Sequence, residues 1–359
     1  MLAPLFMVLM VLAISIFVHA AVGDSSLWSV QTSGMDTNLR GVSVAVYSDH
    51  KGHSTPVIWA SGSNGVILQS KDLGTTWKRL SVSGGETLDF RSIQARDDET
   101  AYAMSSGEGD KSRIYKTTDG GANWKLQYND KRKGFFLDAL VCADEACYAL
   151  SDPVDGKFII LGTLDGENWK ELRSENMPAA LPDEGAFAAS GTCLAVRNNR
   201  EIYFVTGGPR ARVFRSSGGG RSWSVGDAPI ASGNASSGIF SIAIRGELAA
   251  IVVGGDYKDA NKADRTAAYS ADAGKSWKLA EGQAGGYRSA VTWIGDKTAV
   301  AVGPNGEDIS NDGGAHWQHT DALNLNALAA FDSIRIWAVG PNGTIARMDS
   351  LKVFRLETE

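Results

Sequence analysis

The sequence predicts an all-β fold, a single β-propeller of seven four-stranded antiparallel blades, and three observations support this prediction. A short phrase, Ser/Thr-x-Asp-x-Gly-x-x-Trp, recurs along most of the 359 residues, and we call it the box. The tryptophans of successive boxes lie 40 to 54 residues apart, a spacing typical of propeller blades. Short runs with strand-like alternation, separated by glycine, asparagine and aspartate, fill the intervals. Four short antiparallel strands per repeat make a propeller blade.

The box occurs in four complete copies and two altered ones. The complete copies are Ser70–Trp77, Thr117–Trp124, Ser270–Trp277 and Ser310–Trp317; Thr163–Trp169 is one residue short, and Ser216–Trp223 has Gly218 in place of the aspartate. The aspartate can accept backbone N–H bonds across a turn, the glycine can adopt a positive φ, and the tryptophan can cover the sheet edge. We therefore interpret the conserved box positions as structural: Asp72, Trp77, Asp119, Trp124, Asp165, Trp169, Trp223, Asp272, Trp277, Asp312 and Trp317.

The first repeat shows the order of strands most clearly. Residues 40–46 alternate as a half-buried strand, residues 57–62 and 65–70 form the next two, and a fourth begins at Trp77. Asn64 and Gly65 supply a hairpin turn, because both residues tolerate a positive φ. The fourth and fifth repeats are longer, with insertions near residues 177–184, 206–212 and 256–265.

The seventh repeat has no proper box, and the N-terminal end supplies a strand in its place. Residues 27–31 resemble the strand that follows the box in other repeats. We expect this segment to pair with the last blade and close the ring, which removes an exposed sheet edge. Residues 351–356 are also strand-like and compete for the same position.

Residues 1–21 are expected to be a signal peptide or a membrane anchor, and residues 22–359 the propeller. The first segment is apolar, lacks Lys, Arg, Asp and Glu, and places Val18 and Ala20 before a cleavage position. It is also about long enough to span a bilayer. Both interpretations predict export to the periplasm or the extracellular space. Cys142 and Cys147 flank a short turn, so they form either a disulfide across a hairpin or a pair of buried thiols.

Composition and spacing argue against several classes of function. The net charge of −6 is unlike that of a general nucleic-acid binder, so no nucleic-acid partner is expected. The cysteines and histidines show no metal-site spacing. No glycine-rich strand–helix motif supports a nicotinamide cofactor. We therefore expect neither a metal nor a cofactor.

An arginine recurs at the start of the innermost strand in three repeats, where it would line one mouth of the central funnel. Aligning these strands by their apolar cores gives Arg40, Arg91 and Arg288 equivalent positions, with Asp89, Asp138, Glu184 and Tyr287 close by. Clustered arginines suit an anionic ligand, because the guanidinium presents a fixed fork of donors. The alternative is a set of structural ion pairs between blades. These positions, Tyr287 apart, are the candidate ligand-binding residues.

The box resembles the Asp-box, or BNR, repeat of sialidases, sortilin-type receptors and related propellers. Residues 114–124 and 337–346 are most similar to the photosystem II stability/assembly-factor branch of that group. The resemblance covers about residues 27–348. It implies a binding or assembly scaffold, whose arginine-lined funnel would hold a partner protein segment or an anionic ligand; export is expected from residues 1–21.

The resemblance to sialidases implies the alternative function, a glycoside hydrolase acting on acidic sugars. Arg40, Arg91 and Arg288 would then hold the substrate carboxylate, and Asp138, Glu184 and Tyr287 would be the candidate catalytic residues. The phrase Leu39-Arg40-Gly41-Val42 lacks the proline that sialidases carry there. Adjacent residues of a strand also point to opposite faces, which separates Tyr287 from Arg288. Hydrolysis would further require two carboxylates to converge. The enzyme therefore remains the second interpretation.

Overall fold

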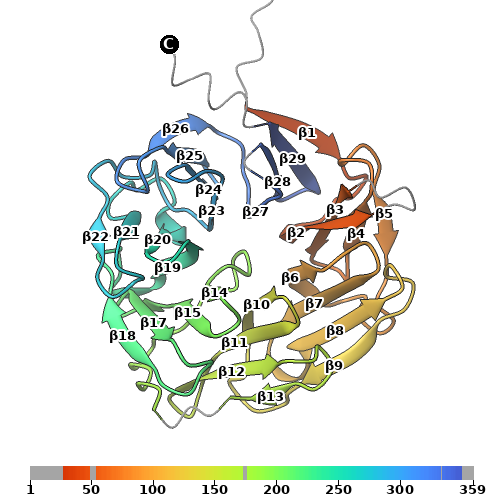
Figure 1. Cartoon of the computed structure of the whole chain (residues 1–359), viewed down its shortest axis with the longest axis horizontal. Coiled ribbons are helices and arrows are strands. Elements are labelled where there is room, and N and C mark those ends of the chain that lie inside the picture. The colour runs from red at the N-terminus through yellow and green to blue at the C-terminus, as the bar shows by residue number, and fades with distance from the viewer. Residues whose placement is uncertain (1–26, 49–53, 173–175, 333, 350–359) are drawn as a thin grey trace, which may run out of the picture.

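Seven antiparallel sheets are arranged around one axis, each as one blade of a propeller (Figure 1). The computed structural model describes residues 27–48, 54–172, 176–332 and 334–349. The arrangement confirms the predicted all-β, seven-bladed fold. Within the described ranges, no helix is long and apolar enough to cross a membrane. The predicted signal or anchor at residues 1–21 and the competing strand at 351–356 lie outside them.

The blades follow one another along the chain, and we number them 1 to 7. Blade 1 contains β2 (Leu39–Ser48), β3 (Ser54–Gly62), β4 (Ile67–Ser70) and β5 (Lys78–Leu80). Blade 2 contains β6 (Asp89–Ala95), β7 (Thr100–Ser106), β8 (Arg113–Thr118) and β9 (Lys125–Asn129). Blade 3 contains β10 (Leu137–Ala143), β11 (Ala146–Val154), β12 (Lys157–Thr163) and β13 (Lys170–Glu171). Blade 4 contains β14 (Leu194–Arg197), β15 (Glu201–Val205), β17 (Arg212–Ser216) and β18 (Ser224–Asp227).

Two of the last three blades include a strand from elsewhere in the chain. Blade 5 contains β19 (Asn234–Arg245), β20 (Ala249–Asp256), β21 (Ala267–Ser270) and β22 (Lys278–Leu279), with β16 (Gly207–Gly208) added beside β19. Blade 6 contains β23 (Ala290–Trp293), β24 (Ala299–Gly303), β25 (Gly306–Ser310) and β26 (Gln318–Asp321). Blade 7 contains β27 (Ala327–Ala330), β28 (Arg335–Val339), β29 (Thr344–Asp349) and the N-terminal β1 (Trp28–Thr32). Among the residues that the structure describes, the 3₁₀ helices η1 (Gly109–Lys111) and η2 (Tyr257–Asp259) lie in loops.

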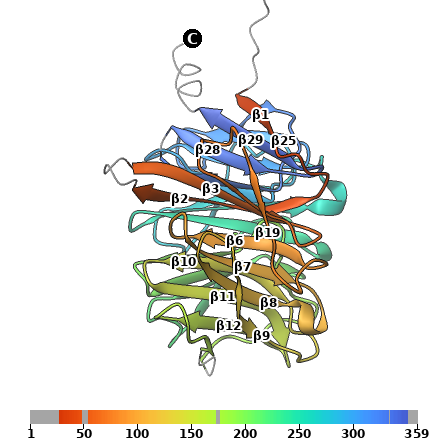
Figure 2. The same cartoon turned by 90° about the vertical axis from the view of Figure 1, so that its right-hand side faces the viewer.

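Strand β1 closes the ring, as the sequence predicts. It pairs antiparallel with β29, from Trp28 opposite Met348 to Thr32 opposite Thr344, and both views show the two strands side by side (Figures 1 and 2). The indole of Trp28 is buried and donates to the carboxylate of Glu307 in blade 6. The first described strand therefore belongs to the last blade.

The hydrophobic core lies between neighbouring blades. The middle strands of the blades are buried on both faces, so consecutive residues are buried in strands such as β4 and β24, and Trp59 and Trp337 are fully buried. The Trp59 indole donates to the carbonyl of Asp97 in the next blade at 3.1 Å. In blade 3, Cys142 and Cys147 form a disulfide across the β10–β11 hairpin, and Cys193 is a buried free thiol. Packing between blades thus holds the innermost strands in fixed positions around the axis.

The box forms a compact turn in which the side chains satisfy the backbone. In the first copy, the Ser70 hydroxyl accepts from Gly74 N at 2.9 Å, and the Asp72 carboxylate accepts from Thr76 N at 2.9 Å. The Trp77 indole donates to the Gly74 carbonyl at 3.1 Å. Gly74 adopts a φ of 86°, which favours glycine at this position. The geometry supports the structural interpretation of the box.

The altered copy in blade 4 offers a direct test of the box aspartate. Gly218 replaces the aspartate, yet Gly220 N still donates to the Ser216 hydroxyl at 2.9 Å. A Cβ at Gly218 would meet nothing closer than 3.6 Å. We expect Gly218→Asp to raise the free energy of unfolding by about 1 kcal/mol, because the new carboxylate can accept from Ser222 N. Denaturant unfolding would measure the change. Gly218→Ala is the control without a carboxylate, and an equal gain in both variants would contradict this account.

Candidate functional site

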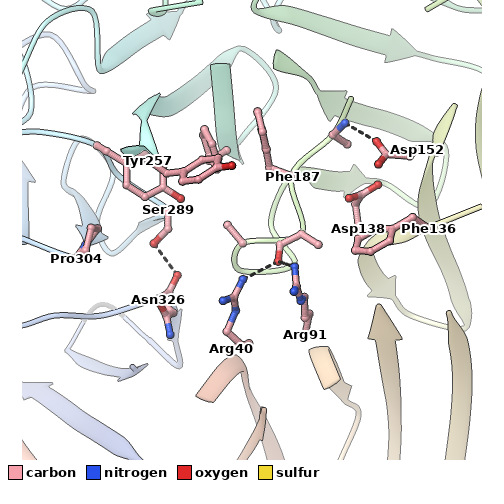
Figure 3. A pocket seen from close by; sticks show the side chains of 15 residues that line it. Arg40, Arg91, Phe136, Asp138, Asp152, Phe187, Tyr257, Ser289, Pro304 and Asn326 are labelled. Carbon is pink, nitrogen blue, oxygen red and sulfur yellow. Dashed lines mark hydrogen bonds between the residues drawn. The ribbon is translucent and has the colours of Figure 1, made fainter. Parts of the chain in front are cut away.

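A cavity of about 440 Å³ lies at the end of the ring where several innermost strands begin (Figure 3). Residues from blades 1, 2, 3, 5, 6 and 7 line it, together with the segment that precedes β14. Arg40, Arg91 and Asp138, which the sequence analysis places near one mouth of the ring, are among the lining residues. The cavity combines two arginines, two carboxyl groups and a wall of aromatic rings.

A β-bulge interrupts the innermost strand in four blades, close to the start of the strand in blades 1 to 3 and in the middle of β19 in blade 5. The strand pairing shifts register between the neighbours of each bulged residue. The bulged residues are Arg40, Arg91, Asp138 and Phe240, and all four line the cavity. A bulge adds a residue on one strand and redirects its side chain. The same backbone device therefore aims one side chain from each of these blades into the cavity.

Arg40 and Arg91 lie side by side on one wall and share an acceptor. The carbonyl of Ala188 accepts from Arg40 Nη2 at 3.1 Å and from Arg91 Nη1 at 3.3 Å (Figure 3). Arg91 Nε also donates to Asp89 Oδ2 at 2.7 Å. Arg40 forms no ion pair within the described part of the chain, and its buried Nε has no hydrogen-bond partner. Burial and the charge of Arg91 lower the pKa of Arg40. This wall therefore carries positive charge in excess.

Asp138 and Asp152 form a pair of carboxyl groups beside the arginines. Asp138 is 1% exposed, and its Oδ2 atom has no hydrogen-bond partner. Asp152, on β11, accepts from Ala186 N at 2.9 Å. Burial raises the pKa of Asp138 well above its usual range, the charge of Asp152 raises it further, and Arg91 opposes both. Burial also raises the pKa of Asp152 to about 6. The pair thus resists full ionisation.

Aromatic rings form the opposite wall. Phe187 and Phe240 stack with centroids 3.8 Å apart and an interplanar angle of 10°. Tyr287 contacts the edge of Phe240 with a centroid separation of 4.6 Å, and Tyr257 lies 6.2 Å from it. Burial raises the pKa of Tyr287, so its phenol stays protonated at neutral pH. This wall can pack against an apolar group of a ligand.

The segment of residues 186–192 crosses the centre of the ring before β14 begins. It brings the Ala188 carbonyl to the two arginines, and the Ser190 hydroxyl donates to the Ser289 carbonyl of blade 6 at 2.7 Å. Gly191 has a φ of 72°, and a Cβ there would lie 2.7 Å from the Ser92 hydroxyl in blade 2. The segment therefore joins opposite sides of the ring and forms part of the cavity lining.

Arg288 does not join the other two arginines, contrary to the sequence alignment. It is fully buried, and its Nε donates to Asp308 Oδ2 at 2.5 Å. The β23–β24 pairing is regular from Ala290 onward, with no bulge. The ordinary alternation of an extended chain places Tyr287 and Ser289 on the cavity side and Arg288 on the other. Of the three arginines of the predicted site, only Arg40 and Arg91 therefore line the cavity.

Glu184 is also placed elsewhere. Its carboxylate accepts from Arg212 Nε at 2.7 Å, from the Thr206 hydroxyl at 2.6 Å and from Leu181 N at 2.8 Å. The alignment led from Glu184 into the innermost strand of blade 4, but that strand begins at Leu194. Glu184 therefore serves a structural ion pair. With Arg288 and Glu184 held in other ion pairs, the arginine trio and the tyrosine–glutamate pair of a sialidase-like site are not assembled.

Several lining residues are absent from the predicted site. Asp152, Phe136 and Phe187 have no equivalent in the alignment of innermost strands, because they come from a second strand and from two connecting segments. The alignment of innermost strands places Phe240 at the same position as the arginines. That equivalence was the only sequence signal that Phe240 lines the cavity. Tyr257 follows the Gly254-Gly255 pair at the start of the insertion in blade 5. The predicted residues that line the cavity are Arg40, Arg91, Asp138 and Tyr287; Asp89 contacts it indirectly through Arg91.

Solved structures similar to this chain are also propellers. YCF48 bound to D1 peptide is 16% identical with a TM-score of 0.63, and the match covers 91% of this chain and 98% of that chain. YCF48 from Cyanidioschyzon merolae is 16% identical with a TM-score of 0.63, covering 91% and 100%. The WD40 beta propeller domain of Doa1 is 13% identical with a TM-score of 0.58, covering 89% and 97%. At these identities the likeness shows a shared fold.

The comparison with curated proteins and the comparison with family models give different results. No curated protein matches the chain. The family model described as the DUF6242 beta propeller domain matches residues 22–286, which is most of the chain. The protein is therefore a member of the DUF6242 beta propeller domain family.

Proposed function

We propose that this propeller is a binding or assembly scaffold that holds a segment of a partner protein in the central cavity. An acidic group of that segment contacts Arg40 and Arg91. One observation carries the proposal: Arg40 is mostly buried beside a second arginine, and one backbone carbonyl is shared between them. A buried charge is costly unless it is paired. A carboxylate can accept two hydrogen bonds from one guanidinium and would complete the pairing.

The nature of the opposite wall supports a peptide as the occupant. Phe187, Phe240 and Tyr257 present ring surface, and Ala186 and Ala189 add small apolar side chains. A cavity of about 440 Å³ falls within the roughly 300–1,000 Å³ of ordinary ligand sites, so it accommodates a few side chains of a longer segment. YCF48, which shares the fold, binds a D1 peptide. These features favour a protein segment over an acidic sugar.

The proposal places the scaffold outside the cytoplasm. The apolar stretch at residues 1–21, without Lys, Arg, Asp or Glu, supports export through a signal peptide or retention by an uncleaved anchor. Cell fractionation and N-terminal sequencing of the mature protein test both possibilities. Mature protein that stays in the cytoplasm would contradict export.

A display library of short random peptides tests the partner-binding proposal. We expect the wild-type protein to enrich peptides with an acidic group next to an apolar side chain. Binding of a selected synthetic peptide should fall about tenfold to a hundredfold in Arg40→Ala, because the mutation removes a charge-assisted hydrogen-bond donor from a buried site. Titration calorimetry would measure the affinity.

The control variant is Arg245→Ala, which removes an arginine from the far end of β19. Arg245 pairs with Asp296, whose side chain is 98% exposed. The control should bind the selected peptide as tightly as the wild type does. Enrichment without any acidic preference, or equal binding by Arg40→Ala, would overturn the proposal.

A further inference from the structure

The proposed contact of an acidic group with Arg40 and Arg91 does not involve the carboxyl groups of Asp138 and Asp152, which also line the cavity. Asp138 lines the cavity, and its buried Oδ2 atom has no hydrogen-bond partner. Asp152 accepts one backbone hydrogen bond, from Ala186 N. Figure 3 shows the two carboxyl groups close to each other at the edge of the cavity, beside the ring of Phe136. Two acids in this position repel each other when both are ionised.

The neighbouring charged and titratable groups do not satisfy Asp138. Arg91, from β6, is the cation that acts on it, but the Arg91 guanidinium donates to Asp89 and to the Ala188 carbonyl. Arg40, from β2, also donates to Ala188. The buried thiol of Cys193, just before β14, is close enough for both carboxyl groups to raise its pKa further after burial has done so. The protein thus supplies Asp138 with a nearby charge but no donor for Oδ2.

A basic group would satisfy this pair, and a metal ion would fit it less well. An ammonium or guanidinium group donates several hydrogen bonds and carries the charge that two carboxyl groups attract. Metal ions such as Ca²⁺ take six to eight oxygen ligands. Among the described residues, no group of three or more His, Cys, Asp or Glu is placed to hold a metal ion.

We propose that Asp138 and Asp152 form a second subsite of the central cavity, which binds a basic group of the partner segment. The inference rests on the proposed function, because the same segment places an acidic group on Arg40 and Arg91. The two subsites adjoin each other, because Asp138 lies next to Arg91 at the edge of the cavity (Figure 3). The recognised segment therefore carries a positive and a negative group close together, with an apolar side chain between or next to them. A lysine or arginine side chain and a free amino terminus share the required chemistry.

The display library distinguishes this inference from the function on which it rests. We expect the wild type to enrich peptides that pair a basic residue with an acidic residue at a fixed spacing. Asp138→Asn should keep the acidic preference and lose the basic one, whereas Arg40→Ala should lose the acidic preference. Asp152→Asn is the second variant, in case Asp138→Asn does not fold. A cooperative thermal transition like that of the wild type establishes folding.

Synthetic versions of one selected peptide measure the effect directly. Replacing its basic residue with norleucine should weaken binding to the wild type by about tenfold or more, as expected for a buried charged hydrogen bond. The same replacement should change binding to Asp138→Asn much less. Acetylating the amino terminus of the peptide tests the other source of positive charge, and a loss on acetylation assigns the subsite to an amino terminus.

Two results would overturn the inference in different ways. Selected peptides with an acidic preference but no basic one would overturn the carboxyl subsite and leave the proposed function intact. Selected peptides without an acidic preference, bound equally by the wild type and Arg40→Ala, would overturn both. Arg245→Ala again serves as the control and should select the same peptides as the wild type.

Discussion

Asp152→Asn is expected to make the protein more stable at neutral pH. Burial raises the pKa of Asp152 to about 6, from 3.8 in the unfolded chain. A carboxyl group with a raised pKa favours the folded state below pH 3.8, and this contribution is lost as the pH rises through about 6. Each pKa unit corresponds to about 1.4 kcal/mol. Ionisation of buried Asp152 therefore lowers the free energy of unfolding of the wild type by on the order of 2–3 kcal/mol at pH 7. An uncharged asparagine avoids that loss and can still accept from Ala186 N.

Urea unfolding of both proteins at several pH values measures this difference. The gain in Asp152→Asn should be largest above about pH 7 and should shrink as the pH falls towards 4, because the wild-type carboxyl group then becomes neutral as well. Asp296→Asn is the matched control: the side chain of Asp296 is 98% exposed, and its substitution should give no gain. A gain in Asp152→Asn that is the same at pH 4.5 and pH 7.5 would contradict the raised pKa.

Gly191→Ala is expected to disrupt the central cavity. The φ of Gly191 is 72°, and a Cβ would lie 2.7 Å from the Ser92 hydroxyl and 2.8 Å from the Ser92 Cβ. Both the backbone conformation and the close contact oppose a side chain, so we expect a loss of about 2–4 kcal/mol in the free energy of unfolding. If the segment moves to relieve the contact, the Ala188 carbonyl leaves Arg40 and Arg91. Peptide binding should then weaken as well.

Gly156→Ala separates the two causes of this effect. Gly156 has a φ of 75°, but a Cβ there would meet nothing within 4 Å. Its substitution should cost about 1 kcal/mol, the price of the backbone conformation alone. Denaturant unfolding of the two variants, with calorimetry of peptide binding, makes the comparison. Equal losses of stability would mean that the contact with Ser92 contributes nothing.

The fold could be predicted because the box and the strand pattern around it recur along the sequence. Each box supplies the same turn chemistry, so the register of one blade can be transferred to the next. The missing strand of blade 7 was predictable for the same reason, since residues 27–31 resemble the strand after a box. The box turns depend on contacts within eight residues, and local patterns report such contacts well.

The site was predictable only in part, because it depends on irregularities. The alignment placed Arg40, Arg91 and Asp138 correctly at the cavity, since blades 1 to 3 share one bulge at that position. It failed at Arg288, which precedes β23 and turns its side chain away from the cavity to Asp308. A shift of one residue reverses the face of a strand, and the sequence carries no clear sign of it.

Asp152 was missed for a related reason. It lies in an irregularity of the β11–β12 pairing, between Ser151 and Val154, and strand alternation does not predict its direction. The segment of residues 186–192 has no regular hydrogen bonding, so neither helical nor strand periodicity marks it. Residues contributed by such segments become visible only when the chain is placed in three dimensions.

The pairing of β1 with β29 has a consequence for the order of synthesis and folding. These strands belong to one sheet, and the Ser33 hydroxyl donates to the Gly343 carbonyl across a sequence separation of 310 residues. Because β1 is synthesised long before β29, it has no pairing partner while the intervening blades are being made. The last blade therefore cannot close before β29 has been made, and until then β1 lacks the partner that protects a strand from wrong pairing.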